Sequence, residues 1–194
     1  METQKPSGGR RSLSFLPLLF FAALIAIFLS QIDKDPSVLP SARLNKPVPS
    51  FALPALDGGK LSEAILSQNQ PVLMNVFASW CQPCLLEHGV ITKIAETGVP
   101  IIGWAYKDKP ADIARFLERL GNPYQHVVLD APGRIAIEFG VYGAPETYVI
   151  DCNGIIRQRF VGALTTKVFD GQLRPALDAL AADPSSGCDS APAA

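Results

Sequence analysis

Short apolar runs alternate with amphipathic segments through the middle of the chain. Residues 71–78 have the sequence PVLMNVFA, a mostly apolar run behind a proline, which predicts a buried central strand. In residues 84–96, the apolar side chains of Leu86, Val90 and Ile94 recur every four positions. This spacing places them on one face of a helix. The two segments together predict a strand followed directly by a helix.

Similar patterns continue towards the end of the chain. They predict strands at 99–106, 126–130, 146–151 and 155–161, and helices at 111–120 and 167–182. The pair Asn153-Gly154 between the last two strands predicts a hairpin. The order is therefore βαβ, then a hairpin, then a helix. Helices between consecutive strands predict an α/β fold, in which helices cover both faces of a mixed central sheet.

The N-terminal part carries a long uncharged apolar segment. Residues 13–32 contain no charged side chain, and Lys5, Arg10 and Arg11 precede them. The segment is long enough to cross a bilayer, at the short end of the usual range. The positive charges favour a cytoplasmic location for residues 1–12 and export of the rest. We therefore expect one N-terminal transmembrane helix, an uncleaved signal-anchor, at 13–32.

Two other interpretations of this segment stay open. A cleaved signal peptide is one, although the run is long for a signal core and no clear A-x-A site follows it. A buried core helix is the other, although it leaves the charge asymmetry unexplained. Residues 33–45 are rich in Pro, Ser and charge, which is typical of a tether. We expect the soluble domain at 46–182 and a flexible tail at 183–194, where few apolar residues are available to pack.

Composition and charge argue for a single globular domain and against a nucleic-acid partner. The chain has 194 residues, of which 48% are hydrophobic, and this suits one domain with a core. Its net charge is −1 and its pI is about 6.1. A nucleic-acid partner would favour a basic patch or stripe, so none is expected.

The four cysteines are Cys81, Cys84, Cys152 and Cys188. The first two form a tight C-x-x-C motif, the third lies at the expected hairpin turn and the fourth lies in the tail. Four cysteines pair in three ways, and the sequence does not choose among them. A bridge between Cys152 and Cys188, free thiols and pairing between molecules all stay open.

The C-x-x-C motif falls between the central strand and the helix after it. A helix N-terminus offers unpaired N–H groups and the positive end of the dipole, and both favour a thiolate. We therefore expect Cys81 to be the exposed attacking sulfur. Cys84, one turn into the helix and more buried, is expected to resolve the mixed disulfide. Such a pair exchanges two electrons, so a protein thiol–disulfide oxidoreductase needs no other cofactor.

Metal binding is the main alternative for this motif. A structural zinc site needs four ligands, and only two lie close in sequence. His88 and His126 are the only histidines, and neither has the paired spacing of a zinc finger. The βαβ setting favours redox chemistry, so no metal is expected.

Several further motifs give the chain a specific resemblance. The segments are FASWCQPCLLEH, GNPY, GVYGAPETYVID and NGII, in this order. In them the chain resembles the CcmG/DsbE family, the periplasmic thiol:disulfide interchange proteins of cytochrome c maturation. The resemblance covers residues from about 47 to 162. It implies a thioredoxin-like fold anchored in the inner membrane, with its soluble domain in the periplasm.

The resemblance also implies a reducing role. The substrate would be the CxxCH thiols of apocytochrome c or of a haem-ligation partner, and the electron donor a membrane thiol carrier of the DsbD or CcdA kind. Two alternatives remain. One is a broader exported oxidoreductase similar to the TlpA or DsbA groups, and the other is a copper chaperone that uses the C-x-x-C motif.

Residue by residue, Cys81 and Cys84 match the family's redox pair. Pro145 matches the cis-proline that faces this pair, and an X-Pro bond is where a cis peptide is least costly. The backbone beside it, at Ala144, is expected to pair with an extended substrate segment. Trp80 is expected to shield the sulfurs or to contact substrate, with packing at the strand end as the alternative.

Two acids complete the expected site. Ordinary thioredoxins carry a buried Asp six residues before the first cysteine, and the residue here is Asn75. Glu87, three residues after Cys84 on the same helix face, and Glu146, beside Pro145, match acidic residues of the family. We expect one or both to replace that Asp as proton acceptor for Cys84. A solvated Glu87 on the helix surface is the alternative.

Overall fold

The computed structural model describes residues 16–32 and 43–188, which fall into two separate compact units. The first unit contains one helix, α1 (Leu16–Ile32), whose apolar side chains, such as Leu18, Phe21 and Ile25, are exposed. None of the helices in the described residues has both the length and the apolarity to cross a membrane. The transmembrane helix predicted for 13–32 is therefore not confirmed, and residues 13–15 lie outside the described residues.

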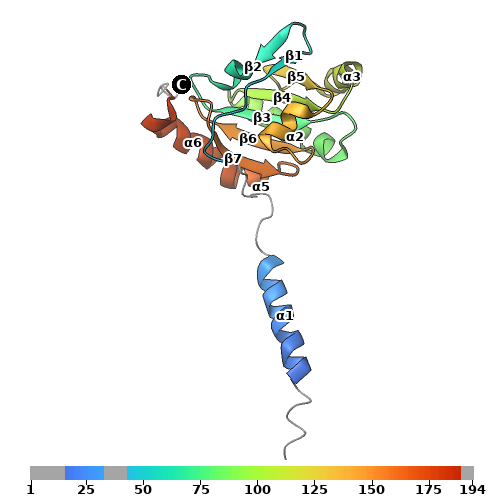
Figure 1. Ribbon diagram of the computed structural model, residues 1–194, viewed down its shortest axis with the longest axis vertical. Coiled ribbons are helices and arrows are strands. Elements are labelled where there is room, and N and C mark those ends of the chain that lie inside the picture. The colour runs from blue at the N-terminus through green and yellow to red at the C-terminus, as the bar shows by residue number, and fades with distance from the viewer. Residues whose placement is uncertain (1–15, 33–42, 189–194) are drawn as a thin grey trace, which may run out of the picture. The chain divides into compact units, whose positions relative to one another are not determined.

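The second unit is built on a five-stranded sheet in the order β5-β4-β3-β6-β7, and Figure 1 shows the strands stacked in that order. Their bounds are Val72–Phe77 for β3, Ile101–Tyr106 for β4, His126–Asp130 for β5, Glu146–Ile150 for β6 and Ile156–Val161 for β7. β3 pairs in parallel with β4, and β4 in parallel with β5. β6 is antiparallel to both β3 and β7. The predicted mixed sheet is confirmed.

The central strand, β3, is buried on both faces because its apolar side chains alternate between two cores. Leu73 and Phe77 face one core, which also receives side chains from α2 (Gln82–Glu96), α3 (Pro110–Leu120) and the C-terminal helices. Val72, Met74 and Val76 face the other core, which α4 (Arg134–Phe139) covers. Helices thus cover both faces of the sheet, as expected.

Several short elements were not predicted from the sequence. They are the hairpin of β1 (Ala52–Pro54) and β2 (Lys60–Ser62), the 3-10 turn η2 (Glu63–Leu66), and the helix α4. The helix predicted at 167–182 is divided into α5 (Thr166–Val168), a π-helical turn η3 (Phe169–Leu173) and α6 (Arg174–Ala182). The wider turn ends two residues before Pro175, which has no N–H for a regular helical hydrogen bond.

The prediction of a flexible tail at 183–194 is wrong for residues 184–188. A 3-10 turn, η4 (Pro184–Ser186), begins at Asp183, whose carboxylate accepts a hydrogen bond from Ser185 N at 2.8 Å. The Ser186 hydroxyl is fully buried and donates to Leu180 O. Cys188 is joined to Cys152 by a disulfide. Polar capping and a covalent bond thus hold this segment where apolar packing does not. Residues 189–194 lie outside the described residues.

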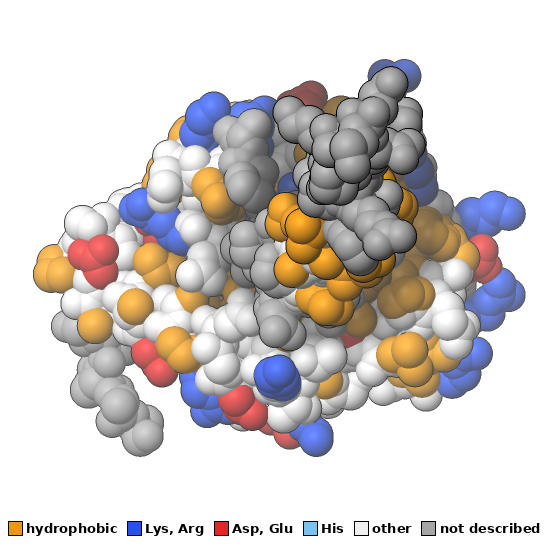
Figure 2. Space-filling view, turned by 90° about the horizontal axis from the view of Figure 1, so that it is seen from below, with side chains coloured by type: hydrophobic (Ala, Val, Ile, Leu, Met, Phe, Trp, Pro, Cys, Tyr) orange, Lys and Arg blue, Asp and Glu red, His pale blue; other side chains and the backbone are white. Residues whose placement is uncertain are grey.

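Charged side chains of both signs are interspersed on the face of the molecule that Figure 2 shows. Lysines and arginines lie beside aspartates and glutamates there. This arrangement agrees with the near-zero net charge of the whole sequence.

Candidate active site

The C-x-x-C motif lies where β3 leads into α2. β3 ends at Phe77, and Cys81 is the N-cap residue of α2. Its Sγ accepts a hydrogen bond from the backbone N–H of Cys84 at 3.1 Å. The two cysteines are joined by a disulfide. In the reduced protein, the same N–H and the helix dipole would stabilise a thiolate on Cys81.

The prediction that Cys81 is the exposed sulfur is wrong for this oxidised form. Cys81 is 3% exposed and Cys84 is 2% exposed, and both belong to the same apolar core as Phe77. By contrast, the neighbouring Trp80 is 58% exposed. Its indole N–H donates to Lys107 O at 3.1 Å, so the ring is held across the loop after β4.

A cis peptide bond joins Ala144 to Pro145, as the resemblance implied. β6 begins at the next residue, Glu146, which pairs with Val76 near the end of β3. Pro145 therefore lies at the same end of the sheet as the C-x-x-C motif. Its carbonyl accepts from Gly162 N at 2.9 Å. Within the described residues, the backbone of Ala144 forms no hydrogen bond, so its N–H and C=O are available to a further strand.

Glu87 lies inside the protein, 2% exposed, and is not the solvated helix residue of the alternative interpretation. Its Oε1 accepts from Asn75 Nδ2 at 3.0 Å, and its Oε2 accepts from Leu164 N at 2.8 Å. Burial raises the pKa of Glu87 to about 7, although both hydrogen bonds act in the opposite direction. A carboxyl group that titrates near neutral pH is suited to accept and return a proton.

Glu146 lies on the other face of the sheet. Its neighbour Tyr148 belongs to the core that α4 covers, whereas Thr147 between them points to Asn75 on the Glu87 side. Glu146 Oε2 accepts from Tyr148 OH at 2.9 Å and from Arg159 Nε at 3.0 Å. The structure therefore does not bring the two predicted acids together.

The other oxygen of Glu146 holds the loop in front of the cis-proline. Oε1 accepts from Tyr142 N at 2.8 Å and from Gly143 N at 3.2 Å. The guanidinium carbon of Arg159 lies 4.5 Å from the centre of the Tyr142 ring, which is 77% exposed. Glu146 thus organises the loop 142–145, and Arg159 supports it from β7.

Three supporting residues were missed by the sequence reasoning. Asp108 is buried and accepts from Ser79 N at 2.6 Å, which fixes the backbone two residues before Cys81. Tyr124 donates through its hydroxyl to Asn75 Oδ1 at 2.8 Å. Arg159 pairs with Glu146. The GNPY motif was a signal for Tyr124, whereas nothing in the sequence indicated the other two partners.

His88, whose role was open, is a packing residue between two helices. Its Nε2 lies 3.1 Å from Gly121 O at the end of α3, and its ring meets that of Phe116 edge-on. Burial lowers the pKa of His88. Its side chain is thus engaged with α3, on a different side of α2 from the Glu87 contacts.

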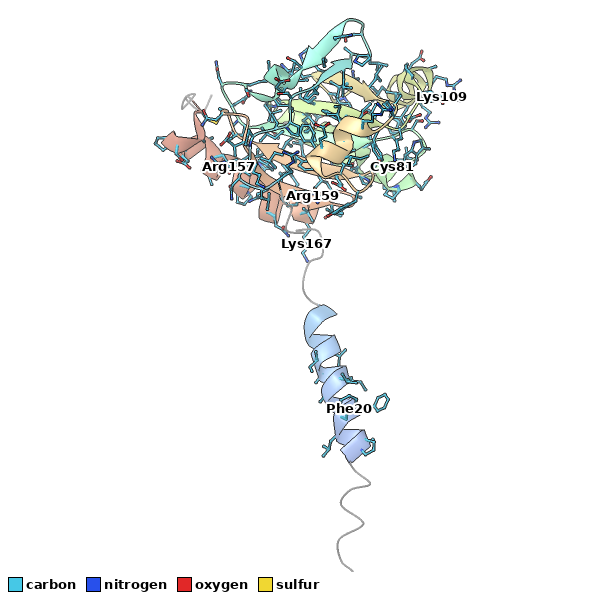
Figure 3. All side chains as sticks on the ribbon, viewed as in Figure 1. Phe20, Cys81, Lys109, Arg157, Arg159 and Lys167 are labelled. Carbon is cyan, nitrogen blue, oxygen red and sulfur yellow. A yellow bond between two sulfur atoms is a disulfide. The ribbon has the colours of Figure 1, made fainter. Side chains whose placement is uncertain are left out.

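The disulfide of Cys152 and Cys188 lies at the far end of the sheet. β6 runs from Glu146, near the C-x-x-C motif, to Ile150, and Cys152 follows in the hairpin turn. Figure 3 shows Cys81 and Arg157, which pairs with Asp151 in that turn, at opposite ends of the domain. The second disulfide is therefore remote from the first.

A C-x-x-C disulfide at a helix N-terminus, at the same end of a mixed five-stranded sheet as a cis-proline, defines a thiol–disulfide oxidoreductase of the thioredoxin fold. The Redoxin family matches residues 43–176. The chain belongs to this family and, within it, to the DsbE thiol:disulfide interchange proteins.

Individual relatives support this assignment. The thiol:disulfide interchange protein DsbE of Escherichia coli is 40% identical over 173 residues, which cover 86% of this chain and 94% of that protein. DsbE of Pseudomonas aeruginosa is 43% identical over 178 residues, which cover 90% of this chain and 98% of that protein. Among solved structures, a thioredoxin family thiol:disulfide interchange protein from Chlorobium tepidum has 28% sequence identity to this chain. Its crystal structure matches with a TM-score of 0.57, over 71% of this chain and 99% of that chain.

Proposed function

We propose that this protein is a membrane-anchored reductant of cytochrome c maturation. In this role it keeps the CxxCH thiols of apocytochrome c, or of a haem-ligation partner, reduced. The observation that carries the proposal is the C-x-x-C pair at the same end of the sheet as a cis-proline, with a buried Glu87 on the helix that begins at the pair. The similarity to DsbE proteins over most of the chain supports it.

The reaction begins from the dithiol. The Cys81 thiolate attacks one sulfur of the substrate disulfide, forms a mixed disulfide and releases the other substrate sulfur as a thiolate. Cys84 then loses its proton, and its thiolate attacks the Cys81 sulfur. This step closes the Cys81–Cys84 disulfide and releases the second substrate thiolate. The substrate gains two electrons, and a membrane thiol carrier of the DsbD or CcdA kind then supplies two others that reduce the Cys81–Cys84 disulfide back to the dithiol.

Glu87 accepts the proton of the Cys84 thiol in this sequence. It lies three residues after Cys84, on the buried side of α2, and its pKa of about 7 leaves the carboxylate well populated at neutral pH. Glu146 acts through the substrate-binding loop instead, because its four hydrogen bonds join Tyr142 and Gly143 of that loop to Tyr148 and Arg159 in the sheet. Trp80, Ala144 and Pro145 contact the substrate.

The anchor is the segment 13–32, with residues 1–12 in the cytoplasm and the catalytic domain in the periplasm. The uncharged run and the basic residues before it support this topology. The disulfide of Cys152 and Cys188 fits an oxidising compartment.

Trapping with Cys84→Ser tests the proposal, because without the resolving thiol the mixed disulfide on Cys81 persists. We expect apocytochrome c or a haem-ligation protein in the trapped complex, released by a reductant. The variant Cys81→Ser/Cys84→Ser is the control and should trap nothing.

A broad set of unrelated exported proteins in the trap would instead indicate an oxidoreductase of the TlpA type. A copper chaperone would bind copper tightly in the reduced form and fail to reduce insulin. Either result would remove the proposed role.

A further inference from the structure

A chain of hydrogen bonds with one direction leads to Glu87 from the loop before β5. The Tyr124 hydroxyl donates to Asn75 Oδ1 at 2.8 Å. Asn75 Nδ2 then donates to Glu87 Oε1 at 3.0 Å and to Thr147 Oγ1 at 3.1 Å. Both amide hydrogens of Asn75 are used, and every member of the chain is buried. Such chains strengthen their own bonds in a low-dielectric interior.

The side chain of Tyr124 reaches Asn75 because β4 carries a glycine where it passes. Asn75 and Gly103 are neighbours in the register of β3 and β4. A Cβ atom on Gly103 would lie 2.8 Å from Tyr124 Cγ, closer than such contacts occur. The Tyr124 ring also stacks on Phe77, with ring centres 4.7 Å apart. A glycine inside a strand often marks such a close approach, and here it makes room for the tyrosine.

We propose that Tyr124 is a positioning residue for the thiol–disulfide reaction, because its hydroxyl holds the Asn75 amide with both N–H groups turned towards Glu87 and Thr147. This inference rests on the proposed role of Glu87 as proton acceptor. If the amide turned over, Asn75 Oδ1 would face Glu87, and an oxygen there favours the protonated acid over the carboxylate. Tyr124 therefore biases Glu87 towards the form that accepts a proton from Cys84.

The groups that face Glu87 agree with this arrangement. They are Asn75 from β3, Tyr124 from the loop before β5 and the Leu164 N–H from the segment after β7. Cys84 lies three residues before Glu87 on α2, a spacing that places both on one face of the helix. The pKa of Tyr124 is raised well above its usual value by burial and by the nearby Glu87 charge, so its hydroxyl keeps its hydrogen. Tyr124 thus acts as a neutral donor across the working pH range.

Removing only the hydroxyl tests the inference. In full-length reduced protein with ¹³C-labelled Glu carboxyl groups, NMR follows the titration of Glu87 in the wild type and in Tyr124→Phe. We expect the Glu87 midpoint to rise by about one pH unit, since a bond to a charged group is lost or weakened. Tyr106→Phe is the matched control, because both tyrosines are 7% exposed, and it should leave the midpoint unchanged.

A second readout follows the mixed disulfide. The rate at which Cys84 resolves it should fall by roughly tenfold in Tyr124→Phe at pH values below the Glu87 midpoint, since the rate follows the carboxylate fraction. Glu87→Gln separates the two proposals. If the mixed disulfide of Glu87→Gln were resolved with the wild-type pH dependence, Glu87 would not be the proton acceptor of Cys84. The NMR comparison of wild type and Tyr124→Phe would still test whether Tyr124 positions the Asn75 amide.

Two further variants cover the case in which Tyr124→Phe does not fold. Gly103→Ala pushes the Tyr124 ring away with its hydroxyl intact, and Thr147→Val removes the second acceptor of the Asn75 amide. Both should raise the titration midpoint of Glu87, whereas Thr147→Ser, which keeps a hydroxyl acceptor, should leave the midpoint at the wild-type value. The inference would be overturned if folded Tyr124→Phe kept the wild-type titration midpoint of Glu87. It would also be overturned if Gly103→Ala and Thr147→Val both kept that midpoint.

Discussion

At the scale of the residue, Glu87 places a carboxyl group where water does not reach. Burial raises its pKa from 4.5 to about 7, so the folded protein binds this proton more tightly than the unfolded chain does. The Glu87 contribution to stability is therefore full below pH 4.5 and is lost as the pH rises through 7. The loss amounts to about 3 kcal/mol when the shift is converted at 1.36 kcal/mol per unit.

The variant Glu87→Gln should remove this pH dependence. A glutamine keeps the shape and one acceptor oxygen but does not titrate in this range. The measurement is urea unfolding of wild type and variant at pH 4.5, 6 and 7.5. We expect the unfolding free energy of the variant to increase relative to that of the wild type as the pH rises. Glu96→Gln, an exposed position on the same helix, serves as control. A constant difference across the range would contradict the raised pKa.

At the scale of the element, the buried pair of Glu146 and Arg159 joins β6 to β7 beneath the cis-proline loop. Arg159 Nη2 lies 2.8 Å from Glu146 Oε2, and both side chains are 1% exposed. Removing one partner leaves the other charge buried and unpaired, which costs about 3–5 kcal/mol. Replacing both costs less than the sum of the two single changes, because neither charge is then left alone.

A double-mutant cycle measures this coupling. Glu146→Gln, Arg159→Met and the combined variant are compared by urea unfolding, with Glu138→Gln, an exposed acid, as control. We expect a coupling energy above 1 kcal/mol between the two sites, as is typical of contacting residues. Additive losses would show that the two side chains do not depend on each other.

The length of each helix or strand decided whether the sequence predicted it. Periodicity located β3, α2 and the strands of the final hairpin, because long segments repeat their pattern often enough to be recognised. It missed β1, β2 and α4, which have three to six residues each and thus fewer than two turns of helix or a single alternation. The C-x-x-C motif and its place before a helix predicted the redox pair, and the resemblance supplied the cis-proline and Glu87.

Side-chain partners across the fold were beyond the reach of the sequence. Arg159 lies in a predicted strand, where a charged residue ordinarily indicates a solvent-facing position, yet the register of β6 and β7 brings it beside Glu146 inside the core. Exposure of Cys81 was likewise predicted from chemistry alone. In the oxidised fold, packing around the disulfide buries both sulfurs.

At the scale of the whole molecule, the disulfide of Cys152 and Cys188 ties the C-terminal helices to the sheet. The two cysteines are 36 positions apart, and the chain between them contains β7, α5, η3 and α6. It also contains Leu164, whose N–H binds Glu87. Closing a loop of this length restricts the unfolded chain and stabilises the fold by about 4 kcal/mol in the chain-entropy description.

The paired variant Cys152→Ser/Cys188→Ser should therefore lower the unfolding free energy by about 4 kcal/mol. The same description gives about 2 kcal/mol for Cys81→Ser/Cys84→Ser, whose loop spans only three positions, so that variant is the matched control for stability. Insulin reduction at 25 °C should persist in the first variant, because its serines lie at the end of the sheet remote from Cys81. An equal stability loss in both variants would contradict the loop-length argument. Loss of insulin reduction in a folded Cys152→Ser/Cys188→Ser protein would instead make the second disulfide part of the redox pathway.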